Sequence, residues 1–350
     1  MSSYLENKIK KILKPSGITL NGKKSWDIQV NDPTAFRDVI IKGSLGFGDS
    51  YVSEKWDVDQ IDTMFEKLLL SDTKHAFNIV DILQSAQSAI INTQAGKRAF
   101  QVGHKHYDIG NSMYEYMLGE SMGYSCGMFV KESDSLTTAQ YNKFDMLCKK
   151  LKLKPGMKVL EIGAGWGTFA RHASKKYGVE VVGLTVSKEQ KAFAEERCKG
   201  LPVKFLLVDY QKLSKKYTDY FDRVVSIEMI EAVGKKNFKK YFEIIERSLK
   251  ADGLFGLQAI IGTGEVDSFI STRIFPNGRL PSPQDIVNKS KNLLQIKQWE
   301  SFGTDYDKTL LAWEANFRRN WNKISKLTNK SGEVLYDVKF YRMWRYYLLC

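Results

Sequence analysis

Between residues 158 and 260 the chain alternates short apolar runs with segments whose apolar residues recur at helical spacing. Short apolar runs bounded by turn residues are typical of buried strands, whereas apolar positions roughly three to four residues apart indicate amphipathic helices. Strands that alternate with helices form a mostly parallel sheet with helices on both faces, an α/β, Rossmann-like fold. The pattern predicts strands at 158–162, 180–185, 203–208, 221–227 and 253–260, and helices at 167–177, 188–199 and 235–250.

The first predicted strand ends in a glycine-rich turn, Gly163-Ala164-Gly165-Trp166-Gly167, which opens the first predicted helix. Glycine allows the backbone to approach a nucleotide-sized ligand closely. The spacing is G-x-G-x-G, which differs from the G-x-G-x-x-G of a dinucleotide site. The second strand ends at Thr185 without the acidic residue that a nicotinamide dinucleotide site places on its ribose. The turn therefore favours S-adenosylmethionine, which has no pyrophosphate, over a packing turn without a ligand.

Ligands of such sheets bind beyond the carboxyl ends of the strands. In this chain that edge gathers Gly163–Gly167, Thr185, Asp209 with Tyr210, and Glu228 to Glu231. The aromatic-rich segment 262–335 is expected to form an insertion or cap over this crevice. Core packing is the default expectation, and an acyl tunnel the alternative, for its large aromatic residues Trp299, Trp313, Phe317 and Trp321.

Residues 1–95 are expected to form a small separate domain, and residues 96–350 the larger, catalytic one. Gly43 to Tyr51 is glycine-dense and is interpreted as turn-rich, whereas 61–70 and 77–91 show helical spacing. The small domain is assigned to lipid binding or dimerisation, so a homodimer is one expectation. The sequence does not decide between these two roles.

The net charge of +13 indicates a polyanionic partner. Lysines and arginines gather near residues 8–14, 149–158 and 318–345, which suits either nucleic acid or an anionic membrane. The first residues lack the apolar run of a signal peptide, and the four cysteines show no paired spacing, so reduced thiols in the cytoplasm are expected. His104 and His106 have no evident third ligand, so no metal is expected.

Several motifs occur in a fixed order, and together they resemble the bacterial cyclopropane-fatty-acyl-phospholipid synthase family. The resemblance covers nearly the whole chain, including the segment from Gly43 to Tyr51. The motifs are His106-Tyr107-Asp108-Ile109-Gly110-Asn111, Tyr124-Ser125-Cys126, Glu161 to Gly167, Gly183-Leu184-Thr185 with Gln190, Met229 to Gly234, Ile274-Phe275-Pro276-Asn277-Gly278 and Phe302-Gly303-x-Asp305-Tyr306.

The resemblance implies transfer of a methylene from S-adenosylmethionine to the cis double bond of an unsaturated phospholipid acyl chain, through a carbocation. It also resolves the question of charge, because basic patches would hold such an enzyme on an anionic membrane surface. The expectation is therefore a peripheral protein on the inner face of the membrane, with no nucleic-acid partner.

In the family resembled, the base is a bound bicarbonate ion. Its ligands would be Cys126, Glu231, Gln258, Ile260 and Tyr306, and Tyr107 would lie at the acyl site. Well-known members carry histidine at the position of Gln258, and glutamine cannot titrate near neutral pH. On the residues alone, a small buried apolar residue is the favoured interpretation of Cys126. For Glu231, a helix-terminal carboxylate is as well supported as a role in the site.

For the cofactor, the resemblance places Gly163, Gly165 and Gly167 at the amino-acid end, in the loop that also carries Trp166. The remaining residues would act around this loop. Glu161 would contribute charge or hold a water, Thr185 and Gln190 would reach the ribose, Asp209 and Tyr210 would lie beside the adenine, and Tyr124 and Ser125 would close over the methionine part.

Three hypotheses remain open at this stage. The first is a lipid-modifying methyltransferase whose product is a cyclopropane or a methyl-branched chain. The second is a methyltransferase for a small molecule or RNA, and the third is a lipid-binding homologue without turnover. Members of the family resembled continue beyond Cys350 by about one helix and one strand, so an incomplete sheet edge is a further expectation.

Overall fold

The computed structural model of the 350-residue chain describes residues 2–71, 110–262, 266–276 and 278–350. These residues divide into two compact units. The N-terminal unit consists of residues 2–71, 266–276 and 317–350, and the sheet unit of residues 110–262 and 278–316. No helix in the described part of the chain is both long and apolar enough to span a bilayer.

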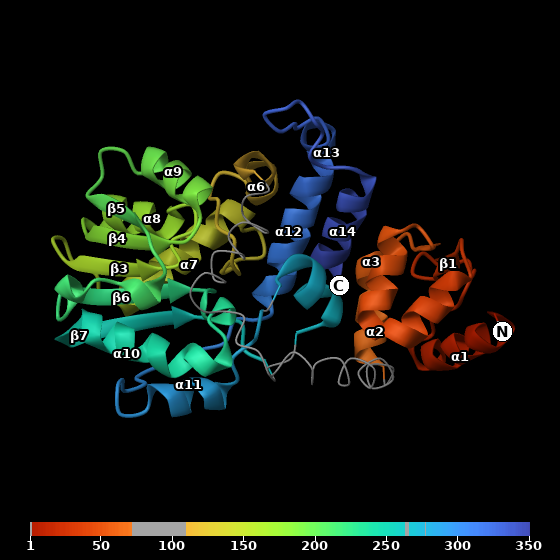
Figure 1. Cartoon of the computed structure of the whole chain (residues 1–350), viewed down its shortest axis with the longest axis horizontal. Coiled ribbons are helices and arrows are strands. Elements are labelled where there is room, and N and C mark those ends of the chain that lie inside the picture. The colour runs from red at the N-terminus through yellow and green to blue at the C-terminus, as the bar shows by residue number, and fades with distance from the viewer. Residues whose placement is uncertain (1, 72–109, 263–265, 277) are drawn as a thin grey trace. The chain divides into compact units, whose positions relative to one another are not determined.

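The sheet unit is built around five parallel strands in the order β5-β4-β3-β6-β7 (Figure 1). The chain winds outward from β3 in one direction and from β6 in the other, so the strand order reverses between these two strands. All five predicted strands are confirmed, although the last begins and ends earlier than expected. Their bounds are β3 Lys158–Ile162, β4 Glu180–Thr185, β5 Val203–Leu207, β6 Phe221–Ile227 and β7 Leu249–Gln258.

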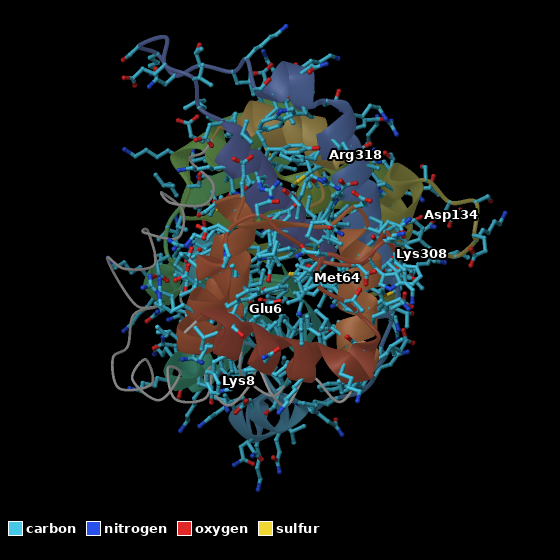
Figure 2. The ribbon with its side chains drawn as sticks, turned by 90° about the vertical axis from the view of Figure 1, so that its right-hand side faces the viewer. Glu6, Lys8, Met64, Asp134, Lys308 and Arg318 are labelled. Carbon is cyan, nitrogen blue, oxygen red and sulfur yellow. The ribbon has the colours of Figure 1, made fainter. Side chains whose placement is uncertain are left out.

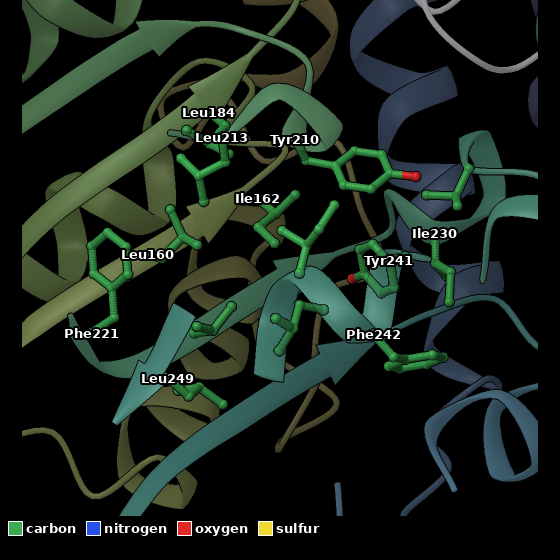
Figure 3. Close-up of a cluster of buried hydrophobic side chains, with 14 of the residues drawn as sticks. Leu160, Ile162, Leu184, Tyr210, Leu213, Phe221, Ile230, Tyr241, Phe242 and Leu249 are labelled. Atoms are coloured by element: carbon green, nitrogen blue, oxygen red, sulfur yellow. The ribbon is translucent and has the colours of Figure 1, made fainter. Parts of the chain in front are cut away.

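Helices cover both faces of this sheet because successive strand residues point to opposite sides. Val159 packs with side chains of α7 and α8, whereas Leu160 and Ile162 pack with the aromatic face of α10 (Figure 3). The three predicted helices are confirmed as α8, α9 and α10. The bounds are α6 Asn111–Leu118, α7 Leu136–Lys150, α8 Thr168–Tyr177, α9 Lys188–Arg197, α10 Phe238–Ser248, α11 Pro283–Ser290 and α12 Asp305–Arg319.

The N-terminal unit is helical and has an aromatic core. Phe47 stacks on Trp56 with ring centroids 4.3 Å apart, and Tyr346 meets Phe65 edge to face at 5.2 Å. A short antiparallel pair, β1 with β2, completes it. The bounds are α1 Ser2–Leu13, β1 Gln29–Val30, α2 Thr34–Val52, β2 Trp56–Asp57, α3 Ile61–Leu70, α13 Trp321–Ile324 and α14 Val338–Leu349, with a π-helical turn at Ile270–Ile274.

The segment from Gly43 to Tyr51 is not turn-rich, which corrects the sequence interpretation. It lies within α2, which is interrupted only at Gly43, where φ is 57° and ψ is −133°. A Cβ atom at Gly48 would lie 2.2 Å from the ring of Phe269, and one at Gly46 would lie 2.0 Å from the backbone oxygen of Asp38. These glycines therefore permit close packing and do not end the helix.

The structure divides the chain differently from the predicted boundary at residue 95. The C-terminal helix α14 belongs to the N-terminal unit, because its aromatic residues Trp344 and Tyr346 are buried there. The predicted cap at 262–335 is likewise not one piece, since 266–276 and 317–335 also fall in the N-terminal unit. A boundary drawn at one point of the sequence could not anticipate this interleaving. The predicted helical segment at 77–91 lies outside the described residues.

Candidate active site

Several of the predicted site residues follow the carboxyl ends of neighbouring parallel strands, and so share one edge of the sheet. Gly163 follows β3 and Glu228 follows β6, on either side of the point where the strand order reverses. Ligands of open α/β sheets bind at this point. The site has two halves, which we call the glycine-loop half, after β3, β4 and β5, and the acid cluster, after β6 and β7.

In the glycine-loop half, Gly163, Gly165 and Gly167 all adopt positive φ, at 86°, 51° and 75°. The structural reason for having glycine differs among these three positions. A Cβ atom at Gly163 would lie 2.7 Å from Met229, and one at Gly167 would lie 2.8 Å from Phe205. A Cβ atom at Gly165 would have no described atom within 4 Å. Packing alone therefore accounts for two of the three glycines, and Gly165 is the one whose backbone faces open space.

Two buried carboxyl groups in this half each keep one oxygen without a hydrogen-bond partner among the described residues. These oxygens are Oε2 of Glu161, in β3, and Oδ2 of Asp209, after β5. The other oxygen of Asp209 accepts from the amide of Gln211 at 2.9 Å. Burial raises the pKa of Glu161 well above its usual range. A buried unpaired oxygen is costly unless a ligand satisfies it.

Thr185 and Gln190, both predicted to reach the ribose, lie side by side. The Thr185 hydroxyl donates to Oε1 of Gln190 at 3.0 Å and accepts from the amide of Ser187 at 3.2 Å. Ser187 caps α9 by accepting from the amide of Gln190 at 3.2 Å.

Tyr210 is largely a core residue. Its ring meets Tyr241 edge to face at 5.6 Å within the apolar cluster beneath α10 (Figure 3). Its hydroxyl is buried with no partner among the described residues, and burial raises its pKa. Only this hydroxyl remains to meet a ligand beside Asp209.

An aromatic series connects the two halves of the site. Trp166 of the glycine loop lies 6.4 Å from Tyr124, Tyr124 lies 5.2 Å from Trp313, and Trp313 lies 6.3 Å from Tyr306, measured between ring centroids. The Trp166 indole donates to Oδ1 of Asn111 at 2.8 Å, which fixes the ring at the loop. Sequence reasoning assigned Trp313 to ordinary core packing, and it is fully buried.

The acid cluster is organised by Glu228, a residue that sequence reasoning placed at this edge without giving it a role. Its Oε1 accepts from the backbone amide of Cys126 and from the amide group of Gln258, both at 2.9 Å. Its Oε2 accepts from the hydroxyl of Tyr306 at 2.9 Å. Three of the five predicted anion ligands therefore converge on this one carboxylate.

Glu231 and Ile260, the other two predicted ligands, are paired with each other. Oε1 of Glu231 accepts from the amide of Ile260 at 2.6 Å, and its Oε2 is buried without a described partner. Burial, followed by the neighbouring charge of Glu228, raises the pKa of Glu231 to about 8. Glu231 is therefore protonated at neutral pH and can donate a hydrogen bond.

Lys143 is a second residue that sequence reasoning missed. It is fully buried on α7 and donates to Oγ of Ser125 and Oε1 of Gln140. Burial lowers its pKa to about 8. Ser125, predicted to close over the cofactor, thus turns its hydroxyl to Lys143. A lysine at an inward position of an otherwise ordinary amphipathic helix was the only sign in the sequence.

The Cys126 thiol is not a nucleophile in this setting, because burial raises its pKa to about 12. Tyr107, His104 and His106 lie outside the described residues. Among the residues that the structure does describe, no group of three His, Cys, Asp or Glu side chains is arranged to hold a metal ion.

Comparison with known proteins identifies the family. Residues 94–350 match the family model for mycolic acid cyclopropane synthetase. The chain is 42% identical over 343 residues to the cyclopropane-fatty-acyl-phospholipid synthase of Escherichia coli K12, covering 96% of this chain and 86% of that protein. It is 30% identical over 332 residues to the tuberculostearic acid methyltransferase UfaA1 of Mycobacterium tuberculosis, covering 87% and 74%.

Solved structures agree with this assignment. Mycolic acid cyclopropane synthase CmaA1, complexed with SAH and CTAB, superposes with a TM-score of 0.64 at 30% identity, covering 71% of this chain and 91% of that one. The cyclopropane synthase MmaA2 from Mycobacterium tuberculosis gives 0.64 at 27% identity, covering 74% and 93%. The chain therefore belongs to the mycolic acid cyclopropane synthetase family and is an S-adenosylmethionine-dependent methyltransferase.

Proposed function

We propose that this chain transfers a one-carbon unit from S-adenosylmethionine to the cis double bond of an unsaturated phospholipid acyl chain, and closes a cyclopropane ring. The named activity of the Escherichia coli relative supports this substrate. The observation that carries the proposal is the acid cluster, where a buried carboxylate, Glu228, lies at the end of an aromatic series that begins at the glycine loop. Such a site can deliver a methyl group and then remove a proton away from water.

The glycine-loop half fits S-adenosylmethionine, whose sulfonium supplies an electrophilic methyl group. In the proposal the open backbone at Gly165 admits the amino-acid end, and the unpaired oxygen of Asp209 accepts from the nucleoside. In the same proposal, Thr185 and Gln190 line the cofactor site next to the glycine loop. The rings of Tyr124 and Trp166 favour the positive sulfur by cation–π attraction, worth about 0.5–2 kcal/mol.

An alkene is a weak nucleophile, so positioning must supply much of the rate. The π electrons of the double bond form a new carbon–carbon bond to the methyl group, and the carbon–sulfur pair stays on sulfur. The acyl chain then carries a cation, which must not meet water. The buried rings of Trp313 and Tyr114 exclude water from this region, and a base must then remove a proton.

The predicted bicarbonate does not fit the described arrangement. The amide of Cys126, the side chain of Gln258 and the hydroxyl of Tyr306 all donate to Glu228. The amide of Ile260 donates to Glu231. A further anion would find these donors engaged and would lie beside a carboxylate of the same charge, which is unfavourable. No step of the proposal is therefore assigned to bicarbonate.

Mass spectrometry of the membrane fatty acids of cells that express the chain tests this function. We expect a product heavier than an unsaturated acyl chain by one CH₂ group and resistant to hydrogenation. Tyr306→Phe should lower its yield about tenfold, since it removes a hydrogen bond to a charged group. Tyr241→Phe is the matched control, because it removes a buried hydroxyl in the core instead.

The other outcomes separate the alternatives. A product that keeps a double bond, or a branched saturated one, would retain methyl transfer but replace ring closure. Methyl label in RNA or in a small molecule would contradict the lipid substrate. Retained cofactor and vesicle binding without any product would favour a lipid-binding homologue.

We also propose that the protein binds an anionic membrane surface through α1 and the turn that follows it. Lys8, Lys11 and Lys14 are exposed there, and Lys8 is seen on α1 in Figure 2. Lys10, in contrast, pairs with Glu6 at 2.7 Å. Each lysine near an anionic surface contributes about 1 kcal/mol.

Co-sedimentation with vesicles tests the membrane proposal. Replacing Lys8, Lys11 and Lys14 together by glutamine should weaken binding to vesicles of anionic phospholipid roughly 100-fold. Replacing Lys188, Lys191 and Lys199, near α9, makes the same change of charge elsewhere and serves as the control. Binding that added salt does not weaken would contradict the proposal.

A further inference from the structure

Glu228 occupies the centre of the acid cluster with the geometry of a bound anion. Three donors from separate parts of the sheet unit meet its two oxygens at 2.9 Å each. They come from the backbone before α7, the end of β7 and the start of α12. Oε1 accepts two of these hydrogen bonds and Oε2 accepts one, so Oε2 keeps a lone pair for another partner.

The backbone at Glu228 is strained. Its φ is 45°, in the left-handed region that costs a non-glycine residue about 1–2 kcal/mol. The strand β6 ends one residue earlier, and the amide of Glu228 donates to the carbonyl oxygen of Gln258 at 2.8 Å. This turn directs the carboxylate back to the donors around Cys126. Strain of this kind clusters at functional sites, where it pre-organises a group.

The charged and titratable groups around Glu228 favour it as the ionised member of the cluster. Glu231 is neutral near pH 7, because its pKa lies at about 8. The Cys126 thiol is neutral, with a pKa of about 12. Lys143 is the neighbouring cation. Burial raises the pKa of Glu228, while Lys143 and the donors from Cys126, Tyr306 and Gln258 lower it. Two adjacent carboxyl groups in different protonation states are typical of an acid–base site.

Resting on the proposed function, we infer that Glu228 is the general base of this enzyme and takes the place of an external anion. After methyl transfer, an oxygen of Glu228 removes a proton from the transferred methyl group. The carbon–hydrogen bonding pair closes the ring on the cationic carbon, and the acyl chain becomes neutral. Glu228 is left protonated and returns the proton to solvent before the next turnover.

Two substitutions of Glu228 test this inference with unsaturated phospholipid vesicles, in buffer freed of carbon dioxide and in buffer with added bicarbonate. The wild-type rate should be the same in both. Glu228→Gln keeps the shape but cannot take a proton, so turnover should fall about 10²–10⁴-fold without rescue. Glu228→Gly releases the donors of Cys126, Gln258 and Tyr306, so bicarbonate should restore part of its activity.

The pH profile gives a second readout. The wild-type rate should rise with pH through the pKa of Glu228, which lies above the ordinary glutamate value. In Glu228→Gly with bicarbonate, the acid limb should follow the ionisation of bicarbonate instead. A wild-type rate that depends on bicarbonate, or a Glu228→Gln variant with an undiminished rate, would overturn the inference while leaving the proposed function intact.

A binding measurement separates failure of the inference from failure of the function, since it needs no turnover. Carbon-13 NMR of labelled bicarbonate should show binding to Glu228→Gly and none to the wild type or to Glu228→Gln. If the wild type forms no lipid product, the proposed function fails, and this measurement still decides whether Glu228 fills the anion position. Binding of bicarbonate to the wild type at the same site would reject that assignment.

Discussion

The central carboxyl groups of the two halves differ in how their buried oxygens are satisfied, although Oε2 of Glu231 in the acid cluster also lacks a described partner. In the glycine-loop half, one carboxyl oxygen each of Glu161 and Asp209 is buried without a described partner. In the acid cluster, Glu228 accepts three hydrogen bonds from the protein itself. Unpaired buried oxygens indicate a place that a ligand completes, whereas a paired carboxylate is already held in position.

From this difference we expect the two halves to have separate roles, one in cofactor binding and the other in the chemical step. The glycine-loop half depends on the cofactor to satisfy its polar atoms, so substitutions there should act on cofactor affinity. The acid cluster is pre-organised before any ligand binds, so substitutions there should act on the chemical step and on its pH dependence. Three further predictions test this division, from the largest expected effect to the smallest.

The first prediction separates the packing glycine from the ligand-facing one. Gly167→Ala should lower the free energy of unfolding by about 3 kcal/mol, because its Cβ would overlap Phe205 and Ala194 at positive φ. Gly165→Ala meets open space, so it should cost only the backbone strain of about 1 kcal/mol and weaken cofactor binding instead. Chemical denaturation and calorimetric titration measure the two effects. An equal decrease in the free energy of unfolding of both variants would contradict the separate roles of Gly165 and Gly167.

The second prediction concerns the unpaired oxygen of Asp209. Asp209→Ala should weaken S-adenosylmethionine binding about 30-fold, the effect of a hydrogen bond to a charged group worth about 2 kcal/mol. Asp222→Ala is the control, because that carboxylate pairs with Lys250 at 2.7 Å near the start of β6. Calorimetric titration measures both. Unchanged affinity in Asp209→Ala would show that its oxygen does not face the ligand.

The third prediction concerns Glu231, whose pKa of about 8 lies above the unfolded value of 4.5. The folded state then binds the extra proton, so this residue's contribution to stability falls as pH rises from about 4.5 to about 8. Glutamine does not titrate, so Glu231→Gln should not lose this contribution to stability as pH rises. Its melting temperature relative to wild type should therefore increase across this range, by about 6 °C.

Glu228→Gln provides the cross-check for this third prediction, because it removes the charge that helps to raise the pKa of Glu231. In that background the pH-dependent difference should shrink. A difference that stays constant with pH in the wild-type background would show that Glu231 does not titrate in this range.

Much of the sheet unit was predictable because its signals are local. The apolar runs that became β3, β4 and β6 need no distant partner to be recognised, and their parallel order follows from the helices between them. The glycine loop was equally clear. Gly46 and Gly48 were misread because a glycine that permits close packing looks the same in sequence as one that makes a turn.

The acid cluster could be predicted only in part. The resemblance brought Cys126, Gln258 and Tyr306 together around a bicarbonate ion, and they do meet, but around the carboxylate of Glu228. An acidic residue directly after a buried strand was the available signal for Glu228. Lys143 had less of a signal, since one lysine in an amphipathic helix usually reaches solvent.

The sequence by itself determined the α/β fold, the sheet edge proposed as the active site and the methyltransferase class, because each depends on short-range patterns. The tertiary structure decided which of two nearby glutamates receives the donors. It also decided which glycine faces open space, and that the C-terminal helix joins the N-terminal unit. These outcomes depend on contacts between residues far apart in the chain, whose burial and hydrogen bonding no local pattern records.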